Sequence, residues 1–193
     1  MPTRDELIRY YGELTDDQLM RIGLYEADEL TQEALEVLKA EIRTRGLGKD
    51  MEAALEVQTC LLSPGDQEEL VACFRQLPCP ICGATGGSLN AGTVATARSF
   101  IIMTTREERL VVGCPKCIVA AAHRATNLTC ALGWWGLPWG PIRTFQAISK
   151  NARTNSTVQG HQATEELRQY VAANRGAVAL LLQQNRGGPD AQS

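Results

Sequence analysis

Two segments near the N-terminus share a pattern of leucines and polar residues that is typical of helix starts. In the stretch 14–19, Thr15 can act as an N-cap, Gln18 completes a capping box, and a leucine stands at each staple position. The cap and the staple recur around Thr31, sixteen residues later, without the glutamine. The second helix has an apolar face and ends in a basic turn before Gly46. We therefore expect two consecutive amphipathic helices in this region.

Apolar residues at helical spacing predict more helices toward both ends of the chain, and Pro64 suits the first turn of one of them. A polar linker is expected over 151–163 and a disordered tail over 187–193. The stretch 14–47 resembles a small helical-hairpin module of bacterial proteins, which implies no chemistry. The further predicted helices cover residues 4–11, 50–61, 64–77, 116–132, 142–150 and 164–186, the last of them amphipathic.

Between these helical regions the pattern changes to short runs that are rich in β-branched residues. Residues 99–105 and 110–113 flank the polar stretch Arg106–Arg109, which predicts a hairpin with its turn at those charged residues. An earlier strand is expected within 88–97. The second strand of the hairpin leads directly into Cys114.

Two Cys-x-x-Cys pairs enclose these strands: Cys79 and Cys82, then, after 31 residues, Cys114 and Cys117. Two residues between cysteines let a tight turn aim both sulfurs at one ion, and four thiolates satisfy tetrahedral zinc. Zn²⁺ is therefore the expected cofactor, with iron in the same ligand set, or no metal at all, as the alternatives. Because four thiolates leave no open position for water, the zinc is expected to be structural rather than catalytic.

The stretch 79–117, with its Cys-Pro-x-Cys-Gly start, resembles bacterial zinc ribbons, and the resemblance implies zinc bound by the four cysteines. The expected fold class is α+β and mostly helical, with a small β zinc ribbon between an N-terminal helical module and a C-terminal helical hairpin. Cys130 and His123, which follow the ribbon, are alternative ligands. The expected domains are an acidic helical module (1–77), the zinc ribbon (78–123), a Trp-rich bent helical hairpin (124–150), the linker, the C-terminal helix and the tail.

All three tryptophans lie in the stretch 132–144, which is interrupted by glycines and prolines and so predicts an aromatic elbow between two helices. The elbow can pack as core over its neighbours, contact a membrane surface, or dock a protein. The membrane interpretation follows from basic flanks and from the preference of tryptophan for the water–lipid boundary. The candidate interaction residues are Trp134, Trp135, Trp139 and Arg143.

Together with the preceding ribbon, the motif Gly-Trp-Trp-Gly-x-Pro-Trp-Gly-Pro-Ile-Arg-Thr resembles a module of uncharacterised bacterial proteins. In that module a zinc ribbon precedes a Trp-rich hairpin, and some members are membrane-associated. The resemblance implies metal binding and no known activity.

Charge is distributed unevenly along the chain. Residues 1–77 contain 17 Asp and Glu against 8 Lys and Arg, and residues 78–193 contain 5 against 11, so balances of −9 and +6 give the net −3. The acidic half is expected to be a scaffold or a docking module for a partner protein. The basic half favours an alternative, nucleic-acid binding through Arg98, Arg106 and Arg109.

Motifs for catalysis are missing from the sequence. It has no phosphate-binding glycine loop, no nucleophile elbow and no His-Glu-x-x-His, so neither an enzyme nor a small-molecule substrate is expected. A start without a secretory signal predicts a cytoplasmic protein, peripheral to a membrane if the elbow contacts one. The leading hypothesis is a non-enzymatic, zinc-stabilised interaction or adapter protein whose partner is another protein or a membrane surface.

Overall fold

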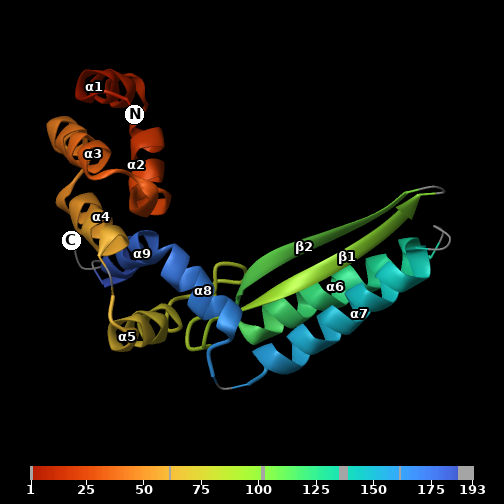
Figure 1. Cartoon of the computed structure of the whole chain (residues 1–193). Helices are drawn as coiled ribbons and strands as arrows, with labels where there is room; N and C mark the ends of the chain where they lie inside the picture. The colour runs from red at the N-terminus through yellow and green to blue at the C-terminus, as the bar shows by residue number, and fades with distance from the viewer. Residues whose placement is uncertain (1, 61, 101–102, 135–138, 161, 187–193) are drawn as a thin grey trace. The chain divides into compact units, whose positions relative to one another are not determined.

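A computed structural model of the chain describes residues 2–60, 62–100, 103–134, 139–160 and 162–186. These residues form a mostly helical protein with one small antiparallel sheet, which confirms the α+β class (Figure 1). The chain divides into two compact units. Unit 1 is the chain up to Leu70 together with the chain from Val171 onward, and unit 2 is Val71–Tyr170. The expected tail over 187–193 lies outside the described residues.

Unit 1 is helical, and its helix starts follow the predicted capping pattern. The Thr15 hydroxyl accepts a hydrogen bond from the Gln18 N–H, and the Gln18 side chain accepts one from the Thr15 N–H. At the end of the third helix Gly46 adopts a left-handed φ of 65°, a conformation that favours glycine. The elements are α1 (Arg4–Glu13), α2 (Asp16–Tyr25), the 3₁₀ turn η1 (Ala27–Glu29), α3 (Gln32–Arg45), α4 (Lys49–Thr59), most of α5 (Pro64–Phe74), and α9 (Arg175–Arg186).

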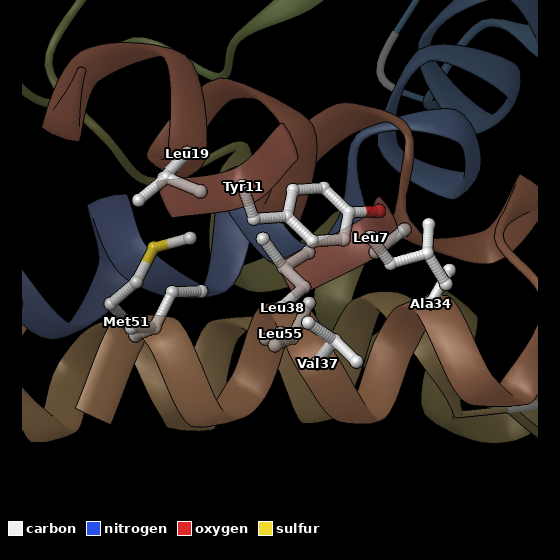
Figure 2. Packing of buried hydrophobic residues seen from close by; sticks show 10 residues of the cluster. Leu7, Tyr11, Leu19, Ala34, Val37, Leu38, Met51 and Leu55 are labelled. Atoms are coloured by element: carbon white, nitrogen blue, oxygen red, sulfur yellow. The ribbon is translucent and has the colours of Figure 1, made fainter. Parts of the chain in front are cut away.

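The core of unit 1 forms where α1 to α4 turn their apolar faces toward one another, and Figure 2 shows side chains from these helices meeting. Leu19, Leu38 and Leu55 are fully buried there. Removing such apolar surface from water is the main force that holds a helical unit together. The buried members of this cluster are Leu7, Tyr11, Leu19, Ala27, Ala34, Val37, Leu38, Ile42, Met51 and Leu55.

The C-terminal helix of unit 1 is held by a buried glutamine. Gln58 of α4 is buried, its Oε1 accepts from the Gly176 N–H at 2.8 Å, and its Nε2 donates to the Ala173 carbonyl. The single helix expected over 164–186 is instead two helices, α8 (Glu165–Ala173) and α9, which are separated at Asn174. The chain beyond residue 170 therefore belongs with the N-terminal helices rather than forming a unit of its own.

Unit 2 is built on one long hairpin. Strand β1 (Asn90–Phe100) pairs antiparallel with β2 (Met103–Gly113), with Thr96 opposite Glu107. The predicted turn at Arg106–Arg109 is wrong: these residues lie inside β2, and the strands extend to Phe100 and Met103 before the chain reverses. The expected early strand within 88–97 is part of β1. The expected first strand of the hairpin, 99–105, is divided, because residues 99–100 belong to β1 and residues 103–105 belong to β2.

Two long helices, α6 (Pro115–Leu132) and α7 (Trp139–Val158), run side by side along the hairpin (Figure 1). Val94 of β1, Ile118 of α6 and Val158 of α7 share one buried cluster. The predicted break after Leu132 is confirmed. The prediction of a linker over 151–163 is wrong for residues 151–158, because α7 continues to Val158. The polar residues Asn151 and Thr154 are buried in that helix.

Candidate metal centre

Four cysteines from two distant parts of unit 2 come together at one end of the hairpin. Cys79 and Cys82 lie in the loop between α5 and β1, whereas Cys114 and Cys117 lie at the start of α6. Their four Sγ atoms are all within 4.8 Å of one another. Sequence spacing had paired these residues, and the structure brings all four to one place.

The first pair is presented by a tight turn. The Gly83 N–H donates to the Cys79 carbonyl at 2.8 Å, and the Cys79 N–H donates to the Ala84 carbonyl at 3.0 Å. Gly83 has a φ of 70°, which a residue with a side chain adopts only with strain. The local hydrogen bonds and the glycine therefore stabilise the turn that carries both cysteines.

The second pair is presented by a helix start rather than by a second turn of the same kind. Cys114 is the N-cap of α6, Pro115 occupies the first turn, and the N–H groups of Cys117 and Ile118 donate to the Cys114 carbonyl. The zinc ribbon is therefore not confirmed. The two strands lie between a cysteine pair carried by a turn and a cysteine pair carried by a helix start, where Pro115 occupies the first turn.

The sulfur positions suit a tetrahedral ion. Sulfurs at about 2.3 Å from a zinc ion would be about 3.8 Å apart at the edges of a regular tetrahedron. Cys82 Sγ and Cys114 Sγ are 3.8 Å apart. The Cys114 N–H donates to Cys79 Sγ at 3.2 Å, a contact that stabilises a thiolate there. The cluster is thus a site that could hold a metal ion.

Charge at the site favours a cation. Although burial raises the pKa of the Cys79 thiol, hydrogen bonds from the backbone N–H groups of Cys114, Cys82 and Ile81 outweigh it and lower this pKa to about 6. The pKa of Cys117 is raised to about 12, chiefly through its hydrogen bonds with Cys114 and Cys82 and through burial. One thiolate forms readily, and further ionisation beside it is costly unless a cation compensates the charge.

A glycine beside the centre was missed by sequence reasoning. A Cβ at Gly113 would lie 2.9 Å from Ile81 Cδ1 and 3.4 Å from Cys79 Sγ, so the strand end passes close to the first ligand. By contrast, a Cβ at Gly87 would make only an ordinary contact of 3.7 Å with Cys114 Cβ. The glycine directly before Cys114 in the sequence is the signal that could have revealed the close approach.

The alternative ligands lie elsewhere. Cys130 and His123 are both exposed on α6, and neither is among the four clustered residues. Cys60 is exposed as well. In the described part of the chain, the four clustered cysteines are therefore the candidate ligands.

At the end of α6 away from the cysteines, the chain before and after the tryptophan elbow comes into close contact, and tryptophan side chains are exposed there. Trp134 is 51% exposed and Trp139 is 62% exposed, so neither is a core residue. Gly133 and Gly140 allow the two helix ends to approach, because a Cβ at Gly140 would lie 2.9 Å from the Gly133 carbonyl. Arg143 is exposed. Trp135 lies outside the described residues.

The arginines proposed to meet nucleic acid lie along the hairpin. Arg98 of β1 and Arg109 of β2 are exposed. Arg106 is engaged, since it forms an ion pair with Glu108 and donates to Gln146 of α7. The three arginines therefore do not form a free cluster at a hairpin turn.

Comparison with known proteins adds no relative to this picture. No protein-family profile, no curated protein and no solved structure matches this chain.

Proposed function

We propose that this protein is a non-enzymatic, zinc-stabilised interaction protein that contacts its partner through the elbow between α6 and α7. The observation that supports it most is the cluster of four Sγ atoms at the near end of α6. Four thiolates fill the coordination of Zn²⁺ and leave no position for substrate. On this proposal the ion joins the loop before β1 to α6 and so stabilises the fold of unit 2.

The exposed indoles at the other end of α6 support the contact role. Large apolar side chains that gather on a surface usually mark a site of interaction. None of the helices in the described part of the chain combines the length and the apolarity that are needed to cross a membrane. Nucleic-acid binding has less support, because Arg106 is bound to Glu108 and Gln146.

Metal analysis of the full-length protein tests the proposal. The wild type should retain one zinc per chain after desalting, and Cys114→Ser should lose it together with part of its helical signal in circular dichroism. Cys130→Ser is the matched control, because Cys130 is exposed on the same helix and outside the cluster. Zinc-free wild type with full helical content would contradict the proposal, as would equal zinc in Cys114→Ser.

A further inference from the structure

Large apolar side chains gather at one end of unit 2. Of the eleven that are exposed in the described part of the chain, five lie within residues 132–145. We call these five the elbow patch. Its members, with their exposed fractions, are Leu132 (40%), Trp134 (51%), Trp139 (62%), Ile142 (49%) and Phe145 (71%).

The patch comprises the end of α6, Trp134 two residues beyond it, and the start of α7. Trp139, Ile142 and Phe145 are three residues apart in turn, so they form a stripe on one side of the helix. Thr144, Ala147 and Asn151 are buried on the other side. Beyond Phe145 the stripe continues with Ser149 and Arg153, so the outer face of α7 is apolar only at the elbow.

The backbone of the elbow holds the patch outward. Ser99 Oγ, near the end of β1, donates to the Gly133 carbonyl at 2.7 Å. A Cβ at Gly140 would lie 3.2 Å from that same Ser99 Oγ. The end of β1 is therefore in contact with the residues on both sides of the elbow, while Trp134 and Trp139 are exposed.

The surroundings of the patch are positively charged. Residues 109–164 contain six Lys and Arg and no Asp or Glu. Arg98, next to Ser99, and Arg143, next to Ile142, are both exposed. The nearest acidic residue before this stretch, Glu108, is bound by Lys150 and Arg106. Glu107, its neighbour in β2, is an exposed carboxylate, so positive charge outweighs negative charge in this region but is not the only sign present.

We propose that the elbow patch docks on an anionic lipid bilayer, with its apolar side chains at the boundary between headgroups and acyl chains and with Arg98 and Arg143 facing the phosphates. This inference rests on the proposed function and names the partner. An excess of positive charge around exposed indoles is the complement of an anionic phospholipid surface. Protein surfaces usually present both signs of charge.

Vesicle binding by the full-length protein tests the inference. The probes are vesicles of phosphatidylcholine with phosphatidylserine and vesicles of phosphatidylcholine alone. All three tryptophans of the chain lie within residues 134–139, so intrinsic fluorescence reports on the elbow without a label. The wild type should sediment with the anionic vesicles, its emission should move to shorter wavelength, and high salt should weaken binding.

Variants that keep all tryptophans give the decisive comparison. Ile142→Ser/Phe145→Ser should weaken partitioning roughly a hundredfold, about tenfold for each side chain. Arg143→Gln should weaken it about fivefold on anionic vesicles only. The matched control Ile8→Ser/Tyr25→Ser, which removes two similarly exposed apolar side chains from unit 1, should bind as the wild type does.

The inference would be overturned if the wild type stayed in solution with anionic vesicles, or if Ile142→Ser/Phe145→Ser bound them as well as the wild type does. It would also be overturned by self-association through the elbow without lipid. The last, read by sedimentation velocity, would make a second copy the occupant. Zinc content and helical signal, measured on the same samples, show whether the zinc-stabilised fold remains when lipid binding fails. Failure of this inference is thereby distinguished from failure of the proposed function.

Discussion

The side-chain amide of Asn151 binds both backbone groups of Ala95. Its Oδ1 accepts from the Ala95 N–H at 2.8 Å, and its Nδ2 donates to the Ala95 carbonyl at 2.9 Å. In this way a residue of α7 occupies the edge of β1 that faces away from β2, as a third strand would. Thr154 and Thr129 act similarly, donating to the Thr93 carbonyl and accepting from the Ala97 N–H respectively.

Replacing Asn151 by a side chain of similar size should destabilise unit 2. In Asn151→Leu the buried N–H and C=O of Ala95 lose their partners, and each unsatisfied group costs about 1–3 kcal/mol. We expect a loss of roughly 2–5 kcal/mol in the free energy of unfolding, measured in urea. Asn127→Leu is the matched control, because Asn127 is exposed on α6, and its free energy of unfolding should change by no more than about 0.5 kcal/mol. Equal midpoints for the two variants would show that Asn151 does not stabilise the strand edge.

This edge explains why the hairpin and the linker were predicted less well than the helix starts. The pairs Thr15/Gln18 and Thr31/Ala34 are local, so their pattern is visible in a short window of sequence. Asn151 reads as a linker residue because its partner is 56 positions away. Tertiary hydrogen bonds decide that 151–158 is helical, and a local window contains no information about them.

The contact between α4 and α9 predicts that Gly176 cannot be replaced without a loss of stability. A Cβ at Gly176 would lie 2.7 Å from the Ala54 carbonyl and 2.8 Å from Gln58 Cβ, and these atoms cannot move aside easily. Gly176→Ala should therefore destabilise unit 1 by about 1–3 kcal/mol despite the better helix propensity of alanine. Gly12→Ala in α1, where a Cβ meets nothing within 4 Å, should stabilise it by about 0.5 kcal/mol. Urea unfolding followed by circular dichroism measures both, and a neutral Gly176→Ala would exclude the close approach.

The ion pair between Glu108 and Lys150 predicts a pH dependence of stability. A hydrogen bond from Lys150 Nζ, 2.6 Å long, and the charges of Lys150 and Arg106 lower the pKa of Glu108. Between the folded and unfolded pKa values the unfolded chain binds more protons, so stability rises with pH there. The contribution is complete above the unfolded value and is lost as pH falls through the folded value.

Its size should be small because both side chains are more than a third exposed, at 37% and 38%. Glu108→Gln should cost below about 1 kcal/mol near neutral pH, and the cost should shrink on acidification. Urea unfolding at a series of pH values measures this difference. The exposed neighbour Glu107, changed to Gln, serves as the control. A cost that grows as pH falls would reverse the sign of the argument.

The candidate metal centre was predicted better than its surroundings, again for a local reason. Two residues between cysteines suffice to place Cys79 and Cys82, or Cys114 and Cys117, side by side. Whether the second pair lies in a turn or on a helix depends on residues 115–132, whose apolar face packs against β1 and α7. The exposure of Trp134 could not be predicted, because its surroundings depend on the contacts of Ser99 with Gly133 and Gly140, which join positions that are far apart in the sequence.

Those surroundings make the strand end at Gly113 a test of how the centre is built. A Cβ there would lie 2.9 Å from Ile81 Cδ1, which can turn away because Ile81 is 51% exposed, and 3.4 Å from Cys79 Sγ, which zinc would hold in place. Gly113→Ala should therefore spare the fold but weaken zinc binding roughly tenfold, as is typical when the residues around metal ligands are disturbed. Competition with a chromophoric chelator measures the affinity. Gly87→Ala is the control, since its Cβ would make an ordinary 3.7 Å contact with Cys114 Cβ and should leave the affinity unchanged. Equal affinities for the two variants would mean that Cys79 Sγ moves away from the strand when the ion binds, and that the sulfur cluster reorganises instead of being preformed.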